Sequence, residues 1–419
     1  MNKNLSHSIS FACILLAISI CFPSCEKEDD SEKESGGQKT PTSSYSIGTV
    51  TATKIALNAI NDLFKYDTTD IREREIKSIS PMTSDDESKN TVAYICNFKD
   101  DAGFAIVAAD SRIKNKIIAC ADNGQFEDNT DNPGLQLMKE NIKAYASNLY
   151  YECNENSSTI KSSLKSTSNT NDTLGKKQVG PLLKTTWSQG YPYNAFLDTC
   201  PVCHEPYYTG CTTTAILQII AYYNCPGTSL MGEMVAKKKA EDLSDLGRGW
   251  VGIYFRVFWR DVPPYEIRCE GTGVEITSAI NYLKSYTYVT NRISLTSKKV
   301  IENLDNKHPV VVIGENVKNG SGHTWIIDGY YHEQDASSAN NTNDTESDPY
   351  FHINWGWGGD CDGWYAAGCF DVEKAEKYDT RINYMERNYA RIVVAYELWP
   401  KDQEIMLDIE EAEVNSENQ

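Results

Sequence analysis

Three cysteines and a histidine stand close together in the segment 199–215, which reads TCPVCHEPYYTGCTTTA. Cys200, Cys203 and His204 have the spacing of a c-type haem attachment site. Cys200 and Cys203 alone also have the spacing of a redox pair or of half a zinc site. Cys211 follows eight residues later and is a candidate nucleophile. The segment therefore offers several chemistries, and other parts of the chain must decide among them.

Cys211 stands at the start of a predicted buried helix. Residues 212–223, TTTAILQIIAYY, are apolar on most sides, which is typical of a helix buried all round, and Pro226-Gly227 then end it. At a helix N-terminus the free N–H groups and the helix dipole stabilise a thiolate. A cysteine in such a place is also commonly just a small buried hydrophobic residue, so partners must decide its role.

Two later segments supply such partners. His323 follows a glycine and precedes the apolar run TWIIDGYY, and Asn354 lies inside the second run YFHINW. If the polar insertion 332–348 forms a loop, the two runs pair as an antiparallel hairpin with His323 and Asn354 as neighbours. Taken alone, His323 is more simply explained as a structural histidine, and Asn354 as a turn residue. Together with Cys211 they match the triad of a thiol peptidase.

Each member of this set has a predicted role. Cys211 attacks a carbonyl carbon, and His323 takes the thiol proton and later delivers it to the leaving amine. Asn354 accepts a hydrogen bond from the imidazole and fixes its orientation. Gln189, in TTWSQGYPYN, is the candidate side-chain donor of an oxyanion hole, beside the N–H of Cys211. Trp355 would cover the hydrogen bond between asparagine and histidine, although ordinary core packing also explains a tryptophan there.

The composition divides the 419 residues into segments, and 40% hydrophobic residues allow a sizeable core. Alternating β-rich runs and helical spacing predict a small α+β domain, and a second domain rich in Trp, Tyr and Gly follows a polar linker. The expected segments are a targeting segment 1–25, a tether 26–46, the first domain 47–152, the linker 153–177, the second domain 178–400 and an acidic tail 401–419.

The first 25 residues have the pattern of an export signal. Lys3 supplies a positive charge, residues 11–22 are apolar but too short to span a membrane, and Ser24-Cys25 resembles the end of a bacterial lipobox. We expect a lipid on Cys25 that anchors the protein in the outer membrane, with plain secretion as the alternative. The mainly acidic segment 26–30, EKEDD, resembles the surface-export signal of Bacteroidetes lipoproteins, and a solvated linker is the simpler interpretation.

Four stretches in this order, VGPLLKTTWSQGYPYN, TGCTTTAILQIIAYY, GHTWIIDGYY and YFHINWGWGGDCDGWY, resemble the streptopain family of papain-like cysteine peptidases. In the first domain, NFKDDAGFAIVAADSRI resembles the propeptide of that family and the related streptopain inhibitors. The resemblance implies an α+β, papain-like peptidase domain, with a buried nucleophile helix and an antiparallel β-sheet. It implies the same roles for Cys211, His323, Asn354 and Gln189, and a shielding role for Trp355.

The resemblance also implies a zymogen. The first domain would hold the site inactive as an intramolecular inhibitor until the linker is cut, by the enzyme itself, near Lys177-Gln178. The chain departs from the family at Thr212 and Thr213, where valine and alanine are usual, and it carries Cys361 and Cys369 in the loop after the Trp-Gly-Trp motif. These departures bear on substrate preference more than on activity.

The remaining cysteines leave several interpretations open. A disulfide involving Cys200 or Cys203 is one, and a bridge between Cys361 and Cys369 is another, with free thiols as the alternative. Zinc bound by Cys200, Cys203 and Cys225, with His204 or Cys211 as a fourth ligand, is a further alternative. The main hypothesis needs no metal and no cofactor.

A net charge of −19 argues against binding of nucleic acid, which needs a basic surface. The expected partners are protein or peptide substrates, the protein's own first domain, and a membrane through the lipid anchor. An amidase or a transpeptidase with the same triad, or a catalytically silent peptidase-like binding protein, are the alternative functions.

Overall fold

The computed structural model describes residues 45–64, 73–127, 133–155, 175–223, 234, 242–269, 271–286, 288–316, 322–334, 349–370 and 390–401. The predicted targeting segment with Cys25, most of the tether, and the acidic tail beyond residue 401 lie outside these residues. Among the described helices, none combines the length and the apolar character that crossing a membrane requires.

The first part of the chain forms a small α+β unit around an antiparallel sheet. Its elements are α1 (Thr49–Leu63), β1 (Ile76–Thr83), β2 (Thr91–Phe98), η1 (Lys99–Asp101), β3 (Phe104–Ala108), β4 (Ile117–Ala121) and α2 (Pro133–Glu155). Side chains alternate between the two faces of β3, so Ala105 and Val107 pack with α1, while Phe104 and Ile106 pack with α2. The two helices therefore cover opposite faces of this sheet.

The second part of the chain contains four further described helices and nine strands. The helices are α3 (Cys211–Tyr223), α5 (Asp245–Asp261), α6 (Ile276–Ser285) and α7 (Ser297–Asp305). The strands are β5 (Gly175–Val179), β6 (Glu266–Ile267), β7 (Thr272–Gly273), β8 (Tyr288–Ile293), β9 (Val310–Asn316), β10 (Gly322–Gln334), β11 (Tyr350–Asn354), β12 (Gly363–Ala366) and β13 (Ala390–Pro400), and η6 (Ala367–Cys369) follows β12. The predicted α+β class is confirmed, with a buried helix that begins at Cys211 and an antiparallel sheet.

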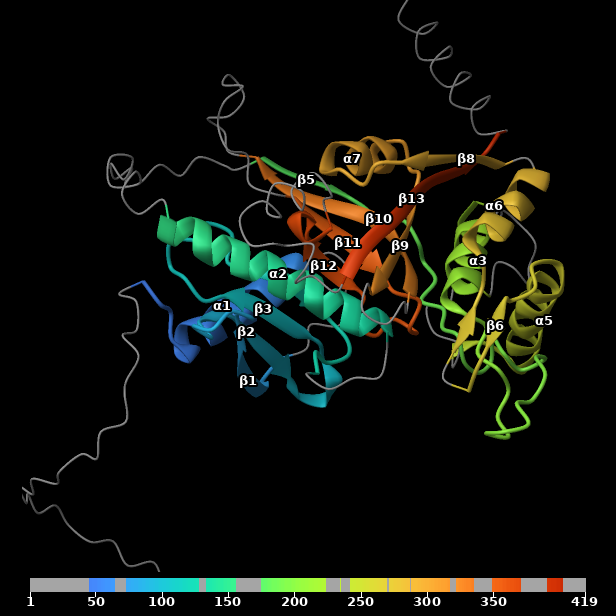
Figure 1. The fold of residues 1–419 in the computed structure, drawn as a ribbon, viewed down its shortest axis with the longest axis horizontal. Helices are drawn as coiled ribbons and strands as arrows, with labels where there is room; N and C mark the ends of the chain where they lie inside the picture. The colour runs from blue at the N-terminus through green and yellow to red at the C-terminus, as the bar shows by residue number, and fades with distance from the viewer. Residues whose placement is uncertain are drawn as a thin grey trace, which may run out of the picture. The chain divides into compact units, whose positions relative to one another are not determined.

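One sheet runs through both parts of the chain (Figure 1). Its strand order is β1-β2-β3-β4-β12-β11-β10-β9-β13-β8, and β5 pairs with β10 beside this path. The junction is the antiparallel pair of β4 and β12, in which Ala119, Cys120 and Ala121 lie opposite Tyr365, Trp364 and Gly363. The two parts are therefore joined by main-chain hydrogen bonds as well as by side chains.

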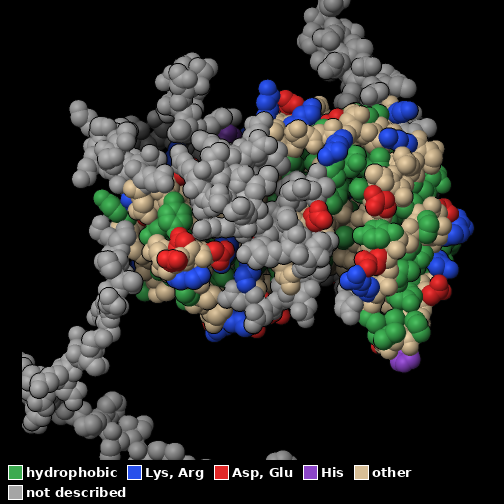
Figure 2. Space-filling view, in the orientation of Figure 1, with side chains coloured by type: hydrophobic (Ala, Val, Ile, Leu, Met, Phe, Trp, Pro, Cys, Tyr) green, Lys and Arg blue, Asp and Glu red, His purple; other side chains and the backbone are tan. Residues whose placement is uncertain are grey.

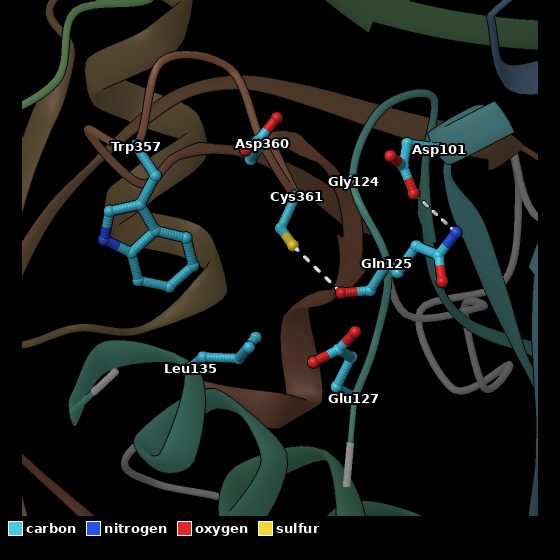
Figure 3. A pocket seen from close by; sticks show the side chains of 8 residues that line it. All are labelled: Asp101, Gly124, Gln125, Glu127, Leu135, Trp357, Asp360 and Cys361. Atoms are coloured by element: carbon cyan, nitrogen blue, oxygen red, sulfur yellow. Dashed lines mark hydrogen bonds between the residues drawn. The ribbon is translucent and has the colours of Figure 1, made fainter. Parts of the chain in front are cut away.

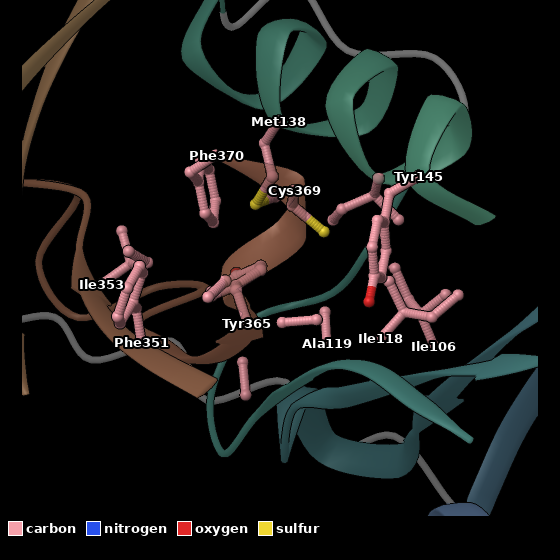
Figure 4. Packing of buried hydrophobic residues seen from close by; sticks show 14 of the residues in the cluster. Ile106, Ile118, Ala119, Met138, Tyr145, Phe351, Ile353, Tyr365, Cys369 and Phe370 are labelled. Atoms are coloured by element: carbon pink, nitrogen blue, oxygen red, sulfur yellow. The ribbon is translucent and has the colours of Figure 1, made fainter. Parts of the chain in front are cut away.

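The core also crosses this junction (Figure 4). Met138 and Tyr145 of α2 pack with side chains of both parts, among them Ile106 and Ile118 of the first part and Phe351 and Phe370 of the second. Burial of apolar surface is the main favourable term in folding and in association. A shared core of this kind stabilises the docked position of the first part.

A second core surrounds α3. Ile216 and Ile219 of this helix pack with Phe255 of α5 and with Val311 and Ile326 of the sheet. The outer face of α5 differs, because it carries a row of exposed side chains, Leu246, Trp250, Ile253 and Val257. Figure 2 shows hydrophobic side chains gathered on the surface over α5 and α6. The helix is therefore apolar on its inner face and partly apolar on its outer face.

Candidate active site

Cys211 is the first residue of α3, and its position depends on the glycine before it. Gly210 has φ +90°, and a Cβ added there would lie 2.8 Å from the carbonyl oxygen of Thr272 in β7. A residue with a side chain would be strained by this backbone conformation and would also collide with β7. Gly210 therefore lets the chain turn sharply into α3 with Cys211 at its partly exposed N-terminus.

His323 lies at the start of β10, with its ring buried among tryptophans. The ring centroids of Trp357, Trp355 and Trp325 lie 5.0, 6.1 and 6.4 Å from that of the imidazole. Its Nε2 lies 3.0 Å from the main-chain oxygen of Trp355. A carbonyl oxygen only accepts hydrogen bonds, so this contact needs a proton on Nε2 and leaves Nδ1 free of it in the neutral ring.

The environment of Cys211 favours its thiolate. Burial of the thiol by itself raises its pKa, but the charge of His323 and hydrogen bonding to His323 and Thr324 have the opposite effect. The net result is a pKa of about 7, below the ordinary value of 9.0. A thiolate that is populated near neutral pH is the form that acts as a nucleophile.

Thr324 is a residue beside Cys211 that the sequence analysis missed. It belongs to β10, next to His323, and its hydroxyl lies 3.0 Å from that of Thr212 in the first turn of α3. This contact ties the strand of the histidine to the helix of the cysteine. Side chains alternate between the two faces of a strand, so Thr324 points to the face of β10 opposite that of His323. This alternation was an available signal in the sequence.

The predicted hydrogen bond between Asn354 and His323 is not formed in this structure, where Asn354 has other partners. The predicted hairpin exists, since β10 pairs with β11, but Asn354 lies opposite Ile326. His323 lies three residues before Ile326 in β10, and three residues span about 10 Å along a strand. The Asn354 amide instead donates to the carbonyl of Thr185 (2.9 Å). Its oxygen accepts from Gln218 (3.0 Å) and from the main-chain N–H of Gly356 (3.1 Å).

Gln218 is the second residue that the sequence analysis missed. It lies on α3 two turns after Cys211 and is fully buried. Its side-chain oxygen accepts from the hydroxyl of Thr185 (2.8 Å) and from the main-chain N–H of Trp187 (3.1 Å), while its amide donates to Asn354. A glutamine inside an otherwise apolar helix was the available signal, because buried polar groups need partners.

Trp355 is held by hydrogen bonds at its main chain and at its ring. Its main-chain N–H donates to Asp362 (2.8 Å), and its indole N–H donates to the hydroxyl of Tyr365 (3.2 Å). Burial raises the pKa of the Asp362 carboxyl to about 7, against the lowering effect of this bond to Trp355. The Trp355 ring stacks on Trp357 at 5.2 Å. The carbonyl that faces His323 therefore has a fixed position.

Gln189, the predicted oxyanion donor, lies beside the loop that leads to Cys211. Its main-chain oxygen accepts from the N–H of Thr209 at 3.0 Å, two residues before the cysteine. The side chain is partly buried. Its place is compatible with the predicted role, which stays a prediction.

The first part of the chain reaches the histidine through Gly134, in the first turn of α2. A Cβ added at Gly134 would lie 2.6 Å from Cγ and Cδ2 of His323 and 2.5 Å from Cζ2 of Trp357. Such distances are far below ordinary van der Waals contact, so no larger residue fits without a shift. The backbone of α2 thus lies directly against the imidazole and against the tryptophan beside it.

A pocket of about 340 Å³ lies next to this contact (Figure 3). Gln125, Glu127 and Leu135 line it from the first part of the chain, and Trp357 and Cys361 line it from the loop after Trp355. The thiol of Cys361 donates to the main-chain oxygen of Gln125 at 3.7 Å. The loop that holds the histidine is therefore itself in contact with the first part of the chain.

The predicted cysteine pairs are not formed in the structure. Cys361 and Cys369 are not joined in a disulfide, and Figure 4 shows Cys369 beside Met138 and Tyr145. Cys200 and Cys203 are also free of disulfides. The predicted zinc ligand Cys225 lies outside the described residues.

The predicted cleavage site lies in a paired strand. Lys177 and Gln178 belong to β5, opposite His332 and Tyr331 of β10. The Lys177 ammonium also forms an ion pair with Asp305 at 3.0 Å. Helix α2 runs to Glu155 and β5 begins at Gly175, so both ends of the predicted linker fall inside regular elements.

Comparisons with known proteins match both parts of the chain. The model of the peptidase C10 family matches residues 187–255 and 265–365, and that of the Spi protease inhibitors matches residues 44–146. The matched residues place the second part of the chain in the peptidase C10 family, as a cysteine peptidase domain. The first part matches an inhibitor-type prodomain, and the two together have the arrangement of a cysteine peptidase made as a zymogen.

Individual relatives are more distant. The chain is 24% identical over 323 residues to the thiol protease/hemagglutinin PrtT of Porphyromonas gingivalis, and the match covers 65% of this chain and 33% of that protein. The chain thus spans about a third of the length of this relative. Two solved structures are also similar. A prointerpain A fragment from Prevotella intermedia has 19% identity, covers 71% of this chain and 93% of its own, and gives a TM-score of 0.47. Active interpain A of the same organism has 20% identity, covers 53% and 94%, and gives a TM-score of 0.37.

The surroundings of Cys211 predict the pH at which its thiol reacts. In the full-length chain, the alkylation rate of Cys211 should rise with pH around a midpoint near 7, because the thiolate is the reacting species. His323→Ala removes the main lowering influence, so the midpoint should move upward. Mass spectrometry of the peptide that contains Cys211, after timed iodoacetamide treatment at several pH values, measures both rates. A midpoint near 9.0 in the unmodified chain would contradict the assignment.

Proposed function

We propose that the protein is a self-inhibited cysteine endopeptidase, made as a zymogen, that hydrolyses peptide bonds through Cys211 and His323. One observation carries the proposal: a thiol with a lowered pKa at a helix N-terminus lies beside an imidazole whose other nitrogen is fixed by the Trp355 carbonyl. A nucleophile, a base and a group that orients the base are the three parts that covalent catalysis of acyl transfer requires.

The reaction would proceed in two steps. The Cys211 thiolate attacks the carbonyl carbon of the substrate, and the negative oxygen is stabilised by the N–H of Cys211 and by the amide of Gln189. The His323 imidazolium gives its proton to the leaving amine, which leaves a thioester on Cys211. A water molecule, deprotonated by the now neutral imidazole, then hydrolyses the thioester and regenerates the thiolate.

In this mechanism Asn354 is a positioning residue. Its side-chain oxygen holds the N–H of Gly356, and Asp362 holds the N–H of Trp355. The two bonds flank the Trp355 carbonyl that orients His323. Asn354 would thus act through the main chain of the loop, while Trp355 covers the imidazole with its ring as well as holding it with its carbonyl.

Substitution of the nucleophile and the base tests the proposal. In the processed protein, Cys211→Ala should abolish hydrolysis of a casein substrate, and His323→Ala should lower kcat/KM about a thousandfold, since it removes the general base. Asn354→Ala should lower kcat more than it raises KM, because it loosens the imidazole without touching the substrate. An epoxide-type thiol inhibitor should modify Cys211 alone. Retained activity of Cys211→Ala, or modification of a different cysteine, would overturn the proposal.

Inhibition by the prodomain would act on the histidine side of the site. The α2 backbone at Gly134 occupies the space next to His323 and Trp357, where a substrate chain must pass to reach Cys211. Cleavage of the linker by the enzyme itself would start the release. A cut at Lys177-Gln178 requires β5 to leave β10 first, because a peptidase binds its substrate as an extended, unpaired chain.

Gly134 supplies a test of this inhibition. Gly134→Ala places a methyl group where His323 and Trp357 leave no room, and overpacking of this kind costs about 1–3 kcal/mol. The unprocessed chain should therefore react with an active-site epoxide about 5- to 150-fold faster, because the prodomain is undocked more often. Gly48→Ala is the matched control, since nothing lies within 4 Å of a Cβ added there. Equal rates for the two variants would contradict the proposal.

The protein would act outside the cytoplasm. We propose that residues 1–25 direct export and that Cys25 carries a lipid in the bacterial outer membrane, with the mainly acidic segment 26–30 favouring display on the cell surface. Cleavage of the linker would then release the peptidase domain. In cells fed labelled palmitate, the unprocessed protein should incorporate the label, and Cys25→Ala should abolish this. Label that persists in the variant would argue against an anchor at this residue.

A further inference from the structure

Three cysteines outside the active site converge on one point. The sulfur atoms of Cys200, Cys203 and Cys269 lie within 4.8 Å of one another, and those of Cys200 and Cys269 are 3.3 Å apart. Cys200 and Cys203 belong to the loop before α3, whereas Cys269 lies at the tip of the hairpin formed by β6 and β7. Figure 1 shows this loop and the hairpin side by side. All three thiols are free of disulfides.

The turn of Cys200 to Cys203 presents a main-chain donor to a sulfur atom. The N–H of Val202 donates to the Cys200 sulfur at 3.4 Å. The turn is closed by a bond from the N–H of His204 to the Cys200 carbonyl at 3.0 Å. Hydrogen bonds to a ligating sulfur are the outer-shell support that thiolate metal ligands use.

We propose that Cys200, Cys203 and Cys269 form a zinc site. A tetrahedral zinc ion with Zn–S bonds of about 2.3 Å holds its sulfur ligands roughly 3.8 Å apart, so three sulfurs within 4.8 Å need only small shifts. Binding releases three thiol protons to solvent, and the three thiolates give the Zn²⁺ centre one net negative charge.

The fourth position of the ion would belong to solvent or to a small ligand. Cys203 is exposed, and it lines a surface hollow of about 440 Å³ together with Cys269. Three protein ligands with one open position is a known coordination for zinc.

The site would connect two segments that border the nucleophile. The loop of Cys200 and Cys203 leads to Gly210 and Cys211, and the hairpin of Cys269 places the Thr272 carbonyl against Gly210. The same hollow is lined by Gly190, the neighbour of Gln189. An ion bound by both segments would fix the entrance to α3 beside the predicted oxyanion donor.

The test uses the full-length chain with Cys211→Ala, which removes the reactive thiol and needs no activity measurement. After purification under reducing conditions, metal analysis should find one more zinc ion per chain than in the same chain with Cys269→Ser. Cobalt(II) should give the intense near-ultraviolet band of sulfur-to-metal charge transfer, and Cys269→Ser should abolish it. Cys203→Ser, at an exposed position, repeats the comparison in case the first variant fails to fold. Cys153→Ser changes a thiol outside the cluster and should retain both signals.

Two results would overturn the proposal. One is metal content and cobalt absorption that are the same with and without Cys269 and Cys203. The other is a disulfide between Cys200 and Cys269, found by peptide mapping of protein isolated without reductant, together with failure to bind zinc after reduction.

Discussion

The pairing of β4 with β12 is the interaction on which the docked position of the first part of the chain depends. It extends the antiparallel sheet of the peptidase domain into the prodomain, with Ala119 to Ala121 opposite Gly363 to Tyr365. An edge strand offers unpaired N–H and C=O groups, and a second strand that pairs with it gains affinity from the main chain alone. This pairing fixes the plane of the prodomain sheet, and the shared core then fixes α2 above it. The contact of Gly134 with His323 is a consequence of these two constraints.

Within the site, the position of the imidazole depends in a similar way on the main chain of Trp355. Its oxygen orients the imidazole, and its nitrogen is held by a buried carboxylate from seven residues later. The imidazole is therefore oriented by main chain, and the side chains of Asn354 and Asp362 hold that main chain in place. The same loop carries Trp357 and Cys361, which the prodomain contacts. Docking of the prodomain and orientation of the histidine thus involve one loop.

The cysteines divide by their surroundings. Cys211 has a charged partner and a helix N-terminus, and its pKa is lowered. Burial instead raises the pKa of Cys96 and Cys361 to about 12, so these thiols stay protonated in the core. Cys200, Cys203 and Cys269 differ again, because they gather near the surface with one another as neighbours. The groups around a thiol determine its pKa and its reactivity, and spacing in the sequence identifies only some of these groups.

The sequence alone determined the α+β class, the helix that begins at Cys211 and the hairpin that carries His323 and Asn354, because these depend on local periodicity and on residues near in the chain. It also identified the family, through motifs with few alternatives. Only the tertiary structure decided the partner of the imidazole. Asn354 and Trp355 are adjacent, and the register of β10 against β11 sets which of them reaches His323. The contact of Gly134 and the approach of Cys269 to Cys200 were decided in the same way. The residues in these two contacts are 189 and 69 positions apart in the sequence. Contacts between residues so far apart in the chain are set by the packing of strands and loops, which no local pattern encodes.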